Sequence, residues 1–312
     1  MKYLEHVNAV LRNAVSSHDG LVVYGQNVSA GSRISGFTKG FAVKETGMII
    51  NTTNTENSLV GFGFGVMLGG GKAAFFMKQL DFLFLGIDQL VNTYNIIRNS
   101  KHAKGSFTIL PVTVDMGYEG PQSSSNNFAD FCSMARIDGY AVTNKYDTEK
   151  IIDIHFGRPG FRIISFSQRM YKDDIIDPGE PILADKDMKF VQYRDGSDAT
   201  IVTFNFSFPY GWQLGLEMEQ TGLKPAVFNV SYMTPIDWEP ILRSVRKTGK
   251  LVVFDDSKSE NLSCFSLLAA ARGISLKKDI FIKRKLGDNW LNPVSDAMDI
   301  DYKSIVRELS SQ

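Results

Sequence analysis

Residues 54–69 read NTENSLVGFGFGVMLG, and they combine one acid with a regular row of glycines. The pattern predicts a helix over residues 55–68 with Glu56 in its first turn. Gly61, Gly65 and Gly69 recur at every fourth position and therefore share one helix face. Glycine inside a helix costs about 1 kcal/mol relative to alanine. The row therefore predicts a close backbone approach along this face, made either by another subunit or by a helix of the same domain.

On both sides of this helix, short apolar strands alternate with helical patterns. Helices are expected at residues 4–16 and 82–97, the second with Leu85 and Ile97 largely buried. Strands are expected at residues 21–24, 48–50, 73–77, 107–114 and 163–166. Strands separated by helices predict a parallel sheet that is covered on both faces.

A polar, turn-rich stretch between residues 171 and 197 predicts a domain boundary. Beyond it we expect strands at residues 200–204, 226–229 and 251–254, and helices at 211–220, 236–247 and 262–271. The predicted organisation is a first domain at residues 1–175, a linker at 176–196 and a smaller α/β domain at 197–312.

The charge balance excludes some classes of partner. Lys and Arg together number 34, as do Asp and Glu, so the formal net charge is zero and neither nucleic acid nor an anionic membrane is expected as a partner. The N-terminus lacks the apolar core of a signal peptide, and the apolar run at residues 59–76 is interrupted by glycines and a lysine. We therefore expect no membrane span and a cytoplasmic location.

Glu56 taken alone has a simple structural explanation. An acid in the first turn of a helix interacts favourably with the helix dipole, which is worth roughly a few tenths of a kcal/mol. A functional role for this residue depends on the motifs that accompany it.

Those motifs together resemble the pyrimidine-binding domain of the transketolase superfamily. They are Thr55-Glu56, the glycines from Gly61 to Gly65, Gln79-Leu80-Asp81-Phe82 and Ile87-Asp88-Gln89-Leu90-Val91-Asn92. More closely, the chain resembles the beta subunit of the first, thiamine-dependent component of 2-oxo acid dehydrogenase complexes. Segments 24–28 and 38–40 match the opening of that domain, and segments 235–237 and 245–250 match the superfamily's C-terminal domain. The implied fold is α/β, with a parallel-sheet pyrimidine-binding domain followed by a smaller α/β transketolase C-terminal domain.

The resemblance implies thiamine diphosphate as cofactor and gives Glu56 a catalytic role. The family's equivalent glutamate hydrogen-bonds a ring nitrogen of the aminopyrimidine, and apolar neighbours such as Leu59 and Val60 are expected to raise the pKa of the carboxyl group. Phe82, with Leu80, is expected to bind the cofactor, and Phe84 is a second aromatic candidate. The glycine row Gly61, Gly65 and Gly69 is expected at a subunit interface.

The chain departs from the family's complete site in its metal-binding part. The Gly-Asp-Gly segment that holds diphosphate through magnesium is absent, because Gly287-Asp288-Asn289 comes too near the C-terminus and has the wrong third residue. The resemblance therefore implies no metal ligands on this chain. It implies an alpha-type partner subunit that holds Mg²⁺ and the diphosphate, in an alpha2beta2 assembly.

A second departure lies in the loop after the strand at residues 107–114. The family carries a histidine where this chain has Ser123, and Gln26 replaces the usual acid near the first strand. A serine hydroxyl can donate a hydrogen bond but cannot hold a positive charge. Gln122 and Ser123 are nevertheless expected to contact the substrate.

Three functions remain open from the sequence. The first is a beta-type subunit that decarboxylates a 2-oxo acid and transfers the acyl group. The second is a split transketolase or carboligase subunit that transfers a two-carbon unit. The third is a non-catalytic scaffold relative.

Overall fold

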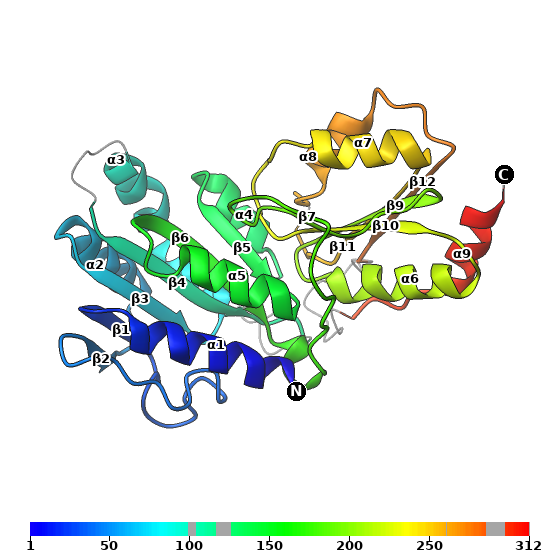
Figure 1. The fold of residues 1–312 in the computed structure, drawn as a ribbon. Helices are drawn as coiled ribbons and strands as arrows, with labels where there is room; N and C mark the ends of the chain where they lie inside the picture. Colours follow the sequence, from blue (N-terminus) through cyan, green and yellow to red (C-terminus); the bar gives the residue numbers. More distant parts are fainter. Residues whose placement is uncertain (99–103, 117–125, 260, 285–296, 312) are drawn as a thin grey trace.

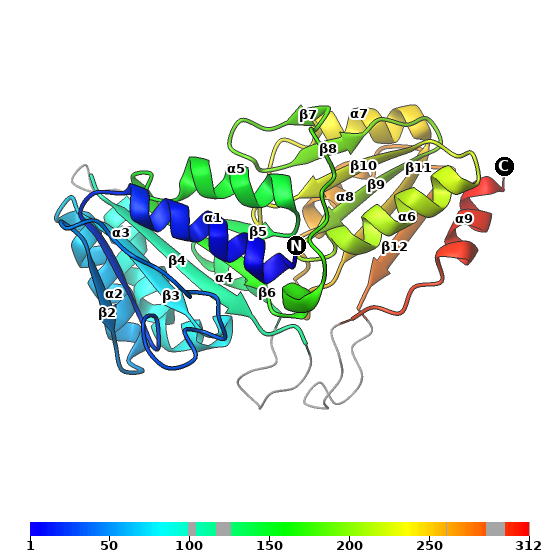
Figure 2. The same ribbon diagram turned by 60° about the horizontal axis from the view of Figure 1, so that its bottom comes forward.

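Two six-stranded sheets form the framework of the chain (Figure 1). The computed structural model describes all residues except 99–103, 117–125, 260, 285–296 and 312. Helices cover both faces of each sheet, and the two layered units lie side by side with the N-terminus near their junction (Figures 1 and 2).

The first sheet is entirely parallel, with the strand order β2-β1-β3-β4-β6-β5. Its strands are β1 (Leu21–Gly25), β2 (Met48–Asn51), β3 (Lys72–Met77), β4 (Ser106–Thr113), β5 (Asp138–Val142) and β6 (Gly160–Ser167). Every residue of β4 is buried, as expected for a central strand covered on both faces. The predicted parallel sheet is confirmed.

Helices α1 (Tyr3–Ser17) and α5 (Lys145–His155) pack side by side on one face of this sheet. Helix α2 (Glu56–Leu68) packs on β3 and β4 from the other face, where α3 (Tyr94–Arg98) and α4 (Phe128–Met134) also lie (Figure 1). Phe64 of α2 contacts Phe107 of β4 and Phe161 of β6, with ring centroids 5.2 and 4.8 Å away. These rings fix α2 to the centre of the sheet.

The helix predicted over residues 82–97 is correct in extent, because residues 80–98 are helical throughout, but it is wrong in expecting one uniform α-helix. The structure has a 3₁₀ segment η1 (Leu80–Gly86), a π-helical turn η2 (Gln89–Thr93) and then the short α3. The reason is a close approach to α2: a Cβ atom on Gly86 would lie 2.9 Å from Val60 Cγ2, so the segment changes its winding where it meets α2. Leu85, expected to be buried, is 65% exposed.

The second sheet has the order β12-β11-β9-β10-β8-β7. Strands β9 (Ala199–Phe204), β10 (Pro225–Val230), β11 (Lys250–Asp255) and β12 (Lys278–Lys283) are parallel, whereas β8 (Val191–Arg194) and β7 (Leu183–Ala184) run antiparallel at one edge. Residues 176–196, predicted as a linker, thus include the two antiparallel strands of this sheet, β7 at its edge and β8 beside it.

Helices also cover this second sheet from two sides. Figure 1 shows α6 (Phe208–Gln220) and α9 (Tyr302–Ser310) on one face, with α7 (Glu239–Thr248) and α8 (Phe265–Ala271) on the other. A short 3₁₀ turn, η3 (Arg169–Lys172), follows β6. Within the described part of the chain, no helix is both long enough and apolar enough to cross a membrane.

Candidate functional site

A small recess lies at the carboxyl ends of β1, β2 and β3, beside the start of α2. Ligands of parallel α/β sheets bind at this end of the strands. The lining residues are Gln26, Thr53, Asn54, Glu56, Leu59, Phe75, Phe76, Met77, Lys78 and Phe82. The recess is therefore built from strand ends, the first turn of α2 and η1.

Glu56 is the first residue of α2 and the only carboxylate in this lining. Its side chain is only 6% exposed. It makes no hydrogen bond or ion pair with any residue that the structure describes. Its oxygens are not among the fully buried polar atoms without a partner, and the residue lines the recess, so this group is available to a donor that enters there.

The walls around Glu56 are mainly apolar and include three phenylalanine side chains. Phe82 is half-buried and lines the recess together with apolar side chains such as Leu59 and Met77. Gln26 and Lys78 add polar groups at the same site. An apolar cavity with a few polar groups is typical of small-molecule sites, and here the arrangement offers a hydrogen-bond acceptor beside an aromatic wall.

The structure brings together only some of the predicted site residues. Glu56 and Phe82 line one recess, whereas Leu80 is completely buried in the core and is not among the lining residues. Phe84 lies outside the recess and packs on Phe131, with ring centroids 4.7 Å apart. Their roles stay predictions. Gln122 and Ser123 lie outside the described residues.

The glycine face of α2 is largely free of neighbours within the described chain. A Cβ atom on Gly65 would meet nothing within 4 Å, and one on Gly61 would meet only the Gln89 side chain, at 3.4 Å. Gly69 is the residue that caps the helix. The close intradomain approach is made by Gly63 instead, where a Cβ atom would lie 2.3 Å from the Phe107 ring. Packing inside the domain therefore explains Gly63 and leaves Gly65 without an intrachain reason.

Comparisons with known proteins agree with this architecture. Residues 189–269 match the transketolase C-terminal domain family. The 2-oxoisovalerate dehydrogenase subunit beta 2 of Arabidopsis thaliana is 24% identical, over 81% of this chain and 72% of that protein. The pyruvate dehydrogenase E1 component subunit beta of Staphylococcus aureus is 21% identical, over 83% of this chain and 81% of that protein. The resemblance to transketolase-like beta subunits is confirmed.

Solved structures show the same transketolase-like fold. A split-gene transketolase, solved as an inactive beta4 tetramer, has a TM-score of 0.64 at 16% identity, and the match covers 89% of this chain and 87% of that chain. The transketolase of Campylobacter jejuni has a TM-score of 0.65 at 10% identity, and the match covers 90% of this chain but 41% of that protein. At these identities the likeness establishes the fold alone.

A buried ionic cluster joins the two transketolase-like units, and the sequence reasoning missed it. Arg169 Nη2 contacts Asp256 Oδ2 at 2.6 Å, and Arg169 Nε lies 3.7 Å from Asp115 Oδ2. Asp115 also accepts from the Ser167 hydroxyl at 2.5 Å and from the Arg169 backbone N–H at 2.8 Å. Burial raises the pKa of Asp115 to about 6, while the charge of Arg169 and the Ser167 bond act in the opposite direction.

This cluster lies beside both ends of the loop that contains Gln122 and Ser123. Asp115 precedes the loop, and Asn126 follows it. Asn126 donates from Nδ2 to the carbonyl of Asp256 at 2.9 Å and accepts from Asn205 Nδ2 at 2.9 Å. No short sequence motif marks these residues, since they come from strand ends far apart in the chain.

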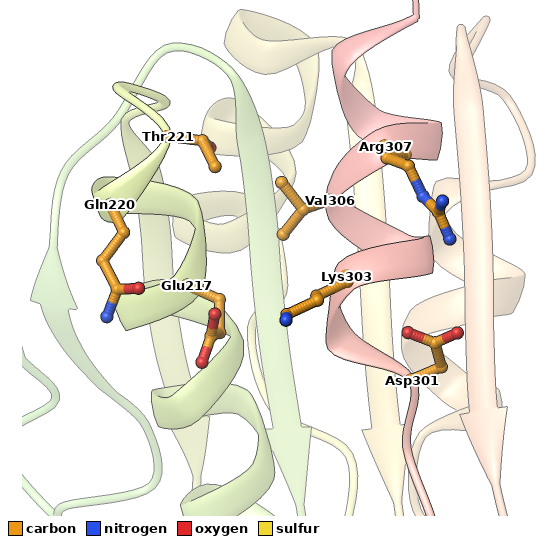
Figure 3. A pocket seen from close by; sticks show the side chains of 7 residues that line it. All are labelled: Glu217, Gln220, Thr221, Asp301, Lys303, Val306 and Arg307. Atoms are coloured by element: carbon orange, nitrogen blue, oxygen red, sulfur yellow. The ribbon is translucent and has the colours of Figure 1, made fainter.

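A second opening lies far from Glu56, between α6 and α9 (Figure 3). Its lining mixes both signs of charge, with Glu217 and Asp301 against Lys303 and Arg307. None of the predicted site residues belongs to it. Among the described residues, no group of three or more His, Cys, Asp or Glu side chains is placed to hold a metal ion.

Proposed function

We propose that this chain is the beta-type subunit of a thiamine-diphosphate-dependent enzyme that acts on a 2-oxo acid. The observation that carries the proposal is Glu56, a buried carboxylate without a partner in an aromatic recess. The aminopyrimidine of thiamine diphosphate is a flat ring with a nitrogen that can share a proton with a carboxyl group, and Glu56 and Phe82 offer such a ring a carboxyl group and an aromatic face. The similarity to 2-oxo acid dehydrogenase beta subunits supports the same cofactor.

Two side chains of the recess, Glu56 and Phe82, have specific roles in this proposal. Glu56 shares a proton with a ring nitrogen and so holds a proton at that atom. Phe82 packs on the face of the ring and excludes water. When bound beside Glu56 and Phe82, the cofactor would supply a nucleophilic carbon for the 2-oxo group. The protein contributes position and proton balance, which are effects of about 10²–10⁴-fold for a well-placed acid–base group.

An alpha-type partner completes the site in this proposal. The chain contains no Gly-Asp-Gly segment, so we assign Mg²⁺ and the diphosphate to the partner. The neighbour-free face at Gly65 supports a close subunit contact along α2. The proposed assembly is alpha2beta2, and the chain is expected to be inactive alone.

The test uses the complex isolated with the tagged chain from its native source. Release of carbon dioxide from pyruvate and from 2-oxoisovalerate is measured with and without added thiamine diphosphate. Glu56→Gln is expected to lower turnover about 10²–10⁴-fold without changing the mass of the complex. Unchanged turnover by Glu56→Gln would remove the proposed role of this residue.

Two-carbon transfer is the second candidate function. Ser123, in place of the expected histidine, favours it because a different acceptor requires different polar groups. The same complex, supplied with a ketose phosphate donor and an aldose acceptor, would then form a new ketose without releasing carbon dioxide. A complex that gives neither product, and whose melting temperature thiamine diphosphate does not raise, would be a scaffold.

A further inference from the structure

The segment formed by η1 and η2, residues 80–93, packs closely against the first turn of α2. A Cβ atom on Gly86 would lie 2.9 Å from Val60 Cγ2 and 3.5 Å from the carbonyl oxygen of Glu56. Only a glycine allows the backbone to come this close. The same segment carries Phe82 into the recess. One element thus touches the residue that bears the acid and supplies the aromatic wall beside it.

Gln89 makes the second contact between this segment and α2. Its Nε2 donates to Asn57 Oδ1 at 2.8 Å, and its Oε1 accepts from the Thr93 hydroxyl at 2.7 Å. The same amide is the group nearest to Gly61, 3.4 Å from the place of a Cβ atom. Both polar ends of the side chain are therefore engaged, and the absence of a side chain at Gly61 leaves room for it.

The winding of η2 allows the Gln89 side chain to make both bonds. Gln89 opens a π-helical turn that ends at Thr93, and single π turns inside helices are frequent at functional sites. Gln89 spans from Thr93 in its own turn to Asn57, the residue next to Glu56. The bond crosses from the element that holds Phe82 to the first turn of the helix that holds Glu56.

We propose that Gln89 is a positioning residue that sets the Glu56 carboxylate against the ring held by Phe82. It acts through Asn57 and touches neither substrate nor cofactor. The inference rests on the proposed function of the recess. The Gln89–Asn57 bond is exposed, so the fold does not depend on it. A small displacement of a reacting group, in contrast, can cost about 10²-fold in rate.

The test is a double-mutant cycle in the isolated complex with thiamine diphosphate and pyruvate or 2-oxoisovalerate, whichever the wild-type complex turns over. Gln89→Ala and Asn57→Ala are each expected to lower kcat about 10–100-fold. The KM for the 2-oxo acid and the mass of the complex are expected to stay unchanged. Because both variants break one bond, the double variant is expected to be no slower than the slower single variant.

Asn92→Ala is the matched control. Asn92 lies in the same π turn, but its amide donates to Asp88 at 2.6 Å and makes no hydrogen bond to α2 among the described residues. Its kcat is expected to equal that of the wild type. Gln89→Glu keeps the acceptor for Thr93 and loses the donor for Asn57, so it is expected to resemble Gln89→Ala.

Several outcomes would overturn the inference. They are an unchanged kcat in Gln89→Ala, multiplicative losses in the double variant, and loss of the assembled complex. If Glu56→Gln is inactive while Gln89→Ala is fully active, only the positioning role fails. If Glu56→Gln is fully active, the proposed function of the recess fails with it.

Discussion

Glu56 and Asp147 are both buried acids in the first turn of a helix, yet their surroundings are opposite. Asp147 of α5 accepts from Asn144 Nδ2 at 2.7 Å, from Asn229 Nδ2 at 2.6 Å and from the Tyr193 hydroxyl at 2.5 Å. Glu56 of α2 accepts no hydrogen bond from any described residue. The helix dipole favours both acids, so the dipole alone does not explain the difference.

The difference separates an acid used for structure from an acid kept for a ligand. Tyr193 and Asn229 belong to strands of the second sheet, so Asp147 fastens the two units together. Burial raises the pKa of Asp147, and its hydrogen bonds act in the opposite direction. Glu56 leaves its hydrogen-bonding capacity unused in the isolated chain. Functional sites commonly carry such unfavourable groups at the expense of stability.

The largest expected effect comes from removing the satisfied acid. Asp147→Ala removes the shared acceptor of three buried hydrogen bonds, and Asn229 and Tyr193 keep only longer alternatives. The substitution is expected to lower the free energy of unfolding by about 3–5 kcal/mol. Glu56→Gln removes a buried charge without a partner and is expected to change it by less than about 1 kcal/mol, or to raise it. Urea unfolding of the isolated chain measures both. Equal losses of unfolding free energy in the two variants would contradict the distinction between a structural acid and an acid kept for a ligand.

Asp115 is intermediate, since it is buried but faces a cation. Its folded pKa of about 6 lies above the ordinary value of 3.8. The protonated form is therefore favoured by folding, and this contribution is present below pH 4 and lost as the pH rises through 6. Relative to Asp115→Asn, the wild type is expected to lose on the order of 3 kcal/mol between pH 4 and pH 7. Parallel stability curves for the two proteins would contradict the assignment.

The smallest effects distinguish the two kinds of glycine in α2. Gly63→Ala is expected to destabilise the chain by about 1–3 kcal/mol, because the new methyl group meets Phe107 and the Tyr24 hydroxyl. Gly65→Ala meets open space and is expected to stabilise the isolated chain by up to about 1 kcal/mol. Thermal unfolding checks both. If Gly65 lies in a subunit contact, sedimentation of the complex will show weaker assembly in that variant, whereas unchanged assembly would exclude the contact.

The sequence predicted most of the fold because hydrophobic periodicity is a local signal. The strand pattern around Leu21–Gly25 and the helix after Thr55 follow from short windows. Strands β7 and β8 were missed in the turn-rich stretch, because the pairing of β8 with β10 and of β7 with β8 is visible only in three dimensions. The break after Phe82 was missed for the same reason, because Gly86 is constrained by Val60 and not by its neighbours in sequence.

The candidate site was predictable where one motif carries it. Glu56 and Phe82 were named from two short motifs that resemble a known family, and they line one recess. Leu80 was named from the same motif, but its side chain faces the core. Arg169, Asp115 and Asp256 come from three distant strand ends, and no local pattern connects them. The absence of hydrogen bonds to Glu56 is likewise a property of the folded chain.

Helix α2 carries the proposed cofactor acid at its start and the proposed contact glycine nine residues later. Glu56 and Gly65 are therefore only roughly 14 Å apart along one rigid rod. A subunit that binds the glycine face also fixes the orientation of Glu56. Subunit binding and cofactor binding are therefore thermodynamically linked. Linkage is reciprocal. If the cofactor raises the affinity between the subunits, the assembled complex must bind the cofactor with higher affinity than the isolated subunit does. Dilution of the enzyme would then release cofactor, and removal of cofactor would separate the subunits.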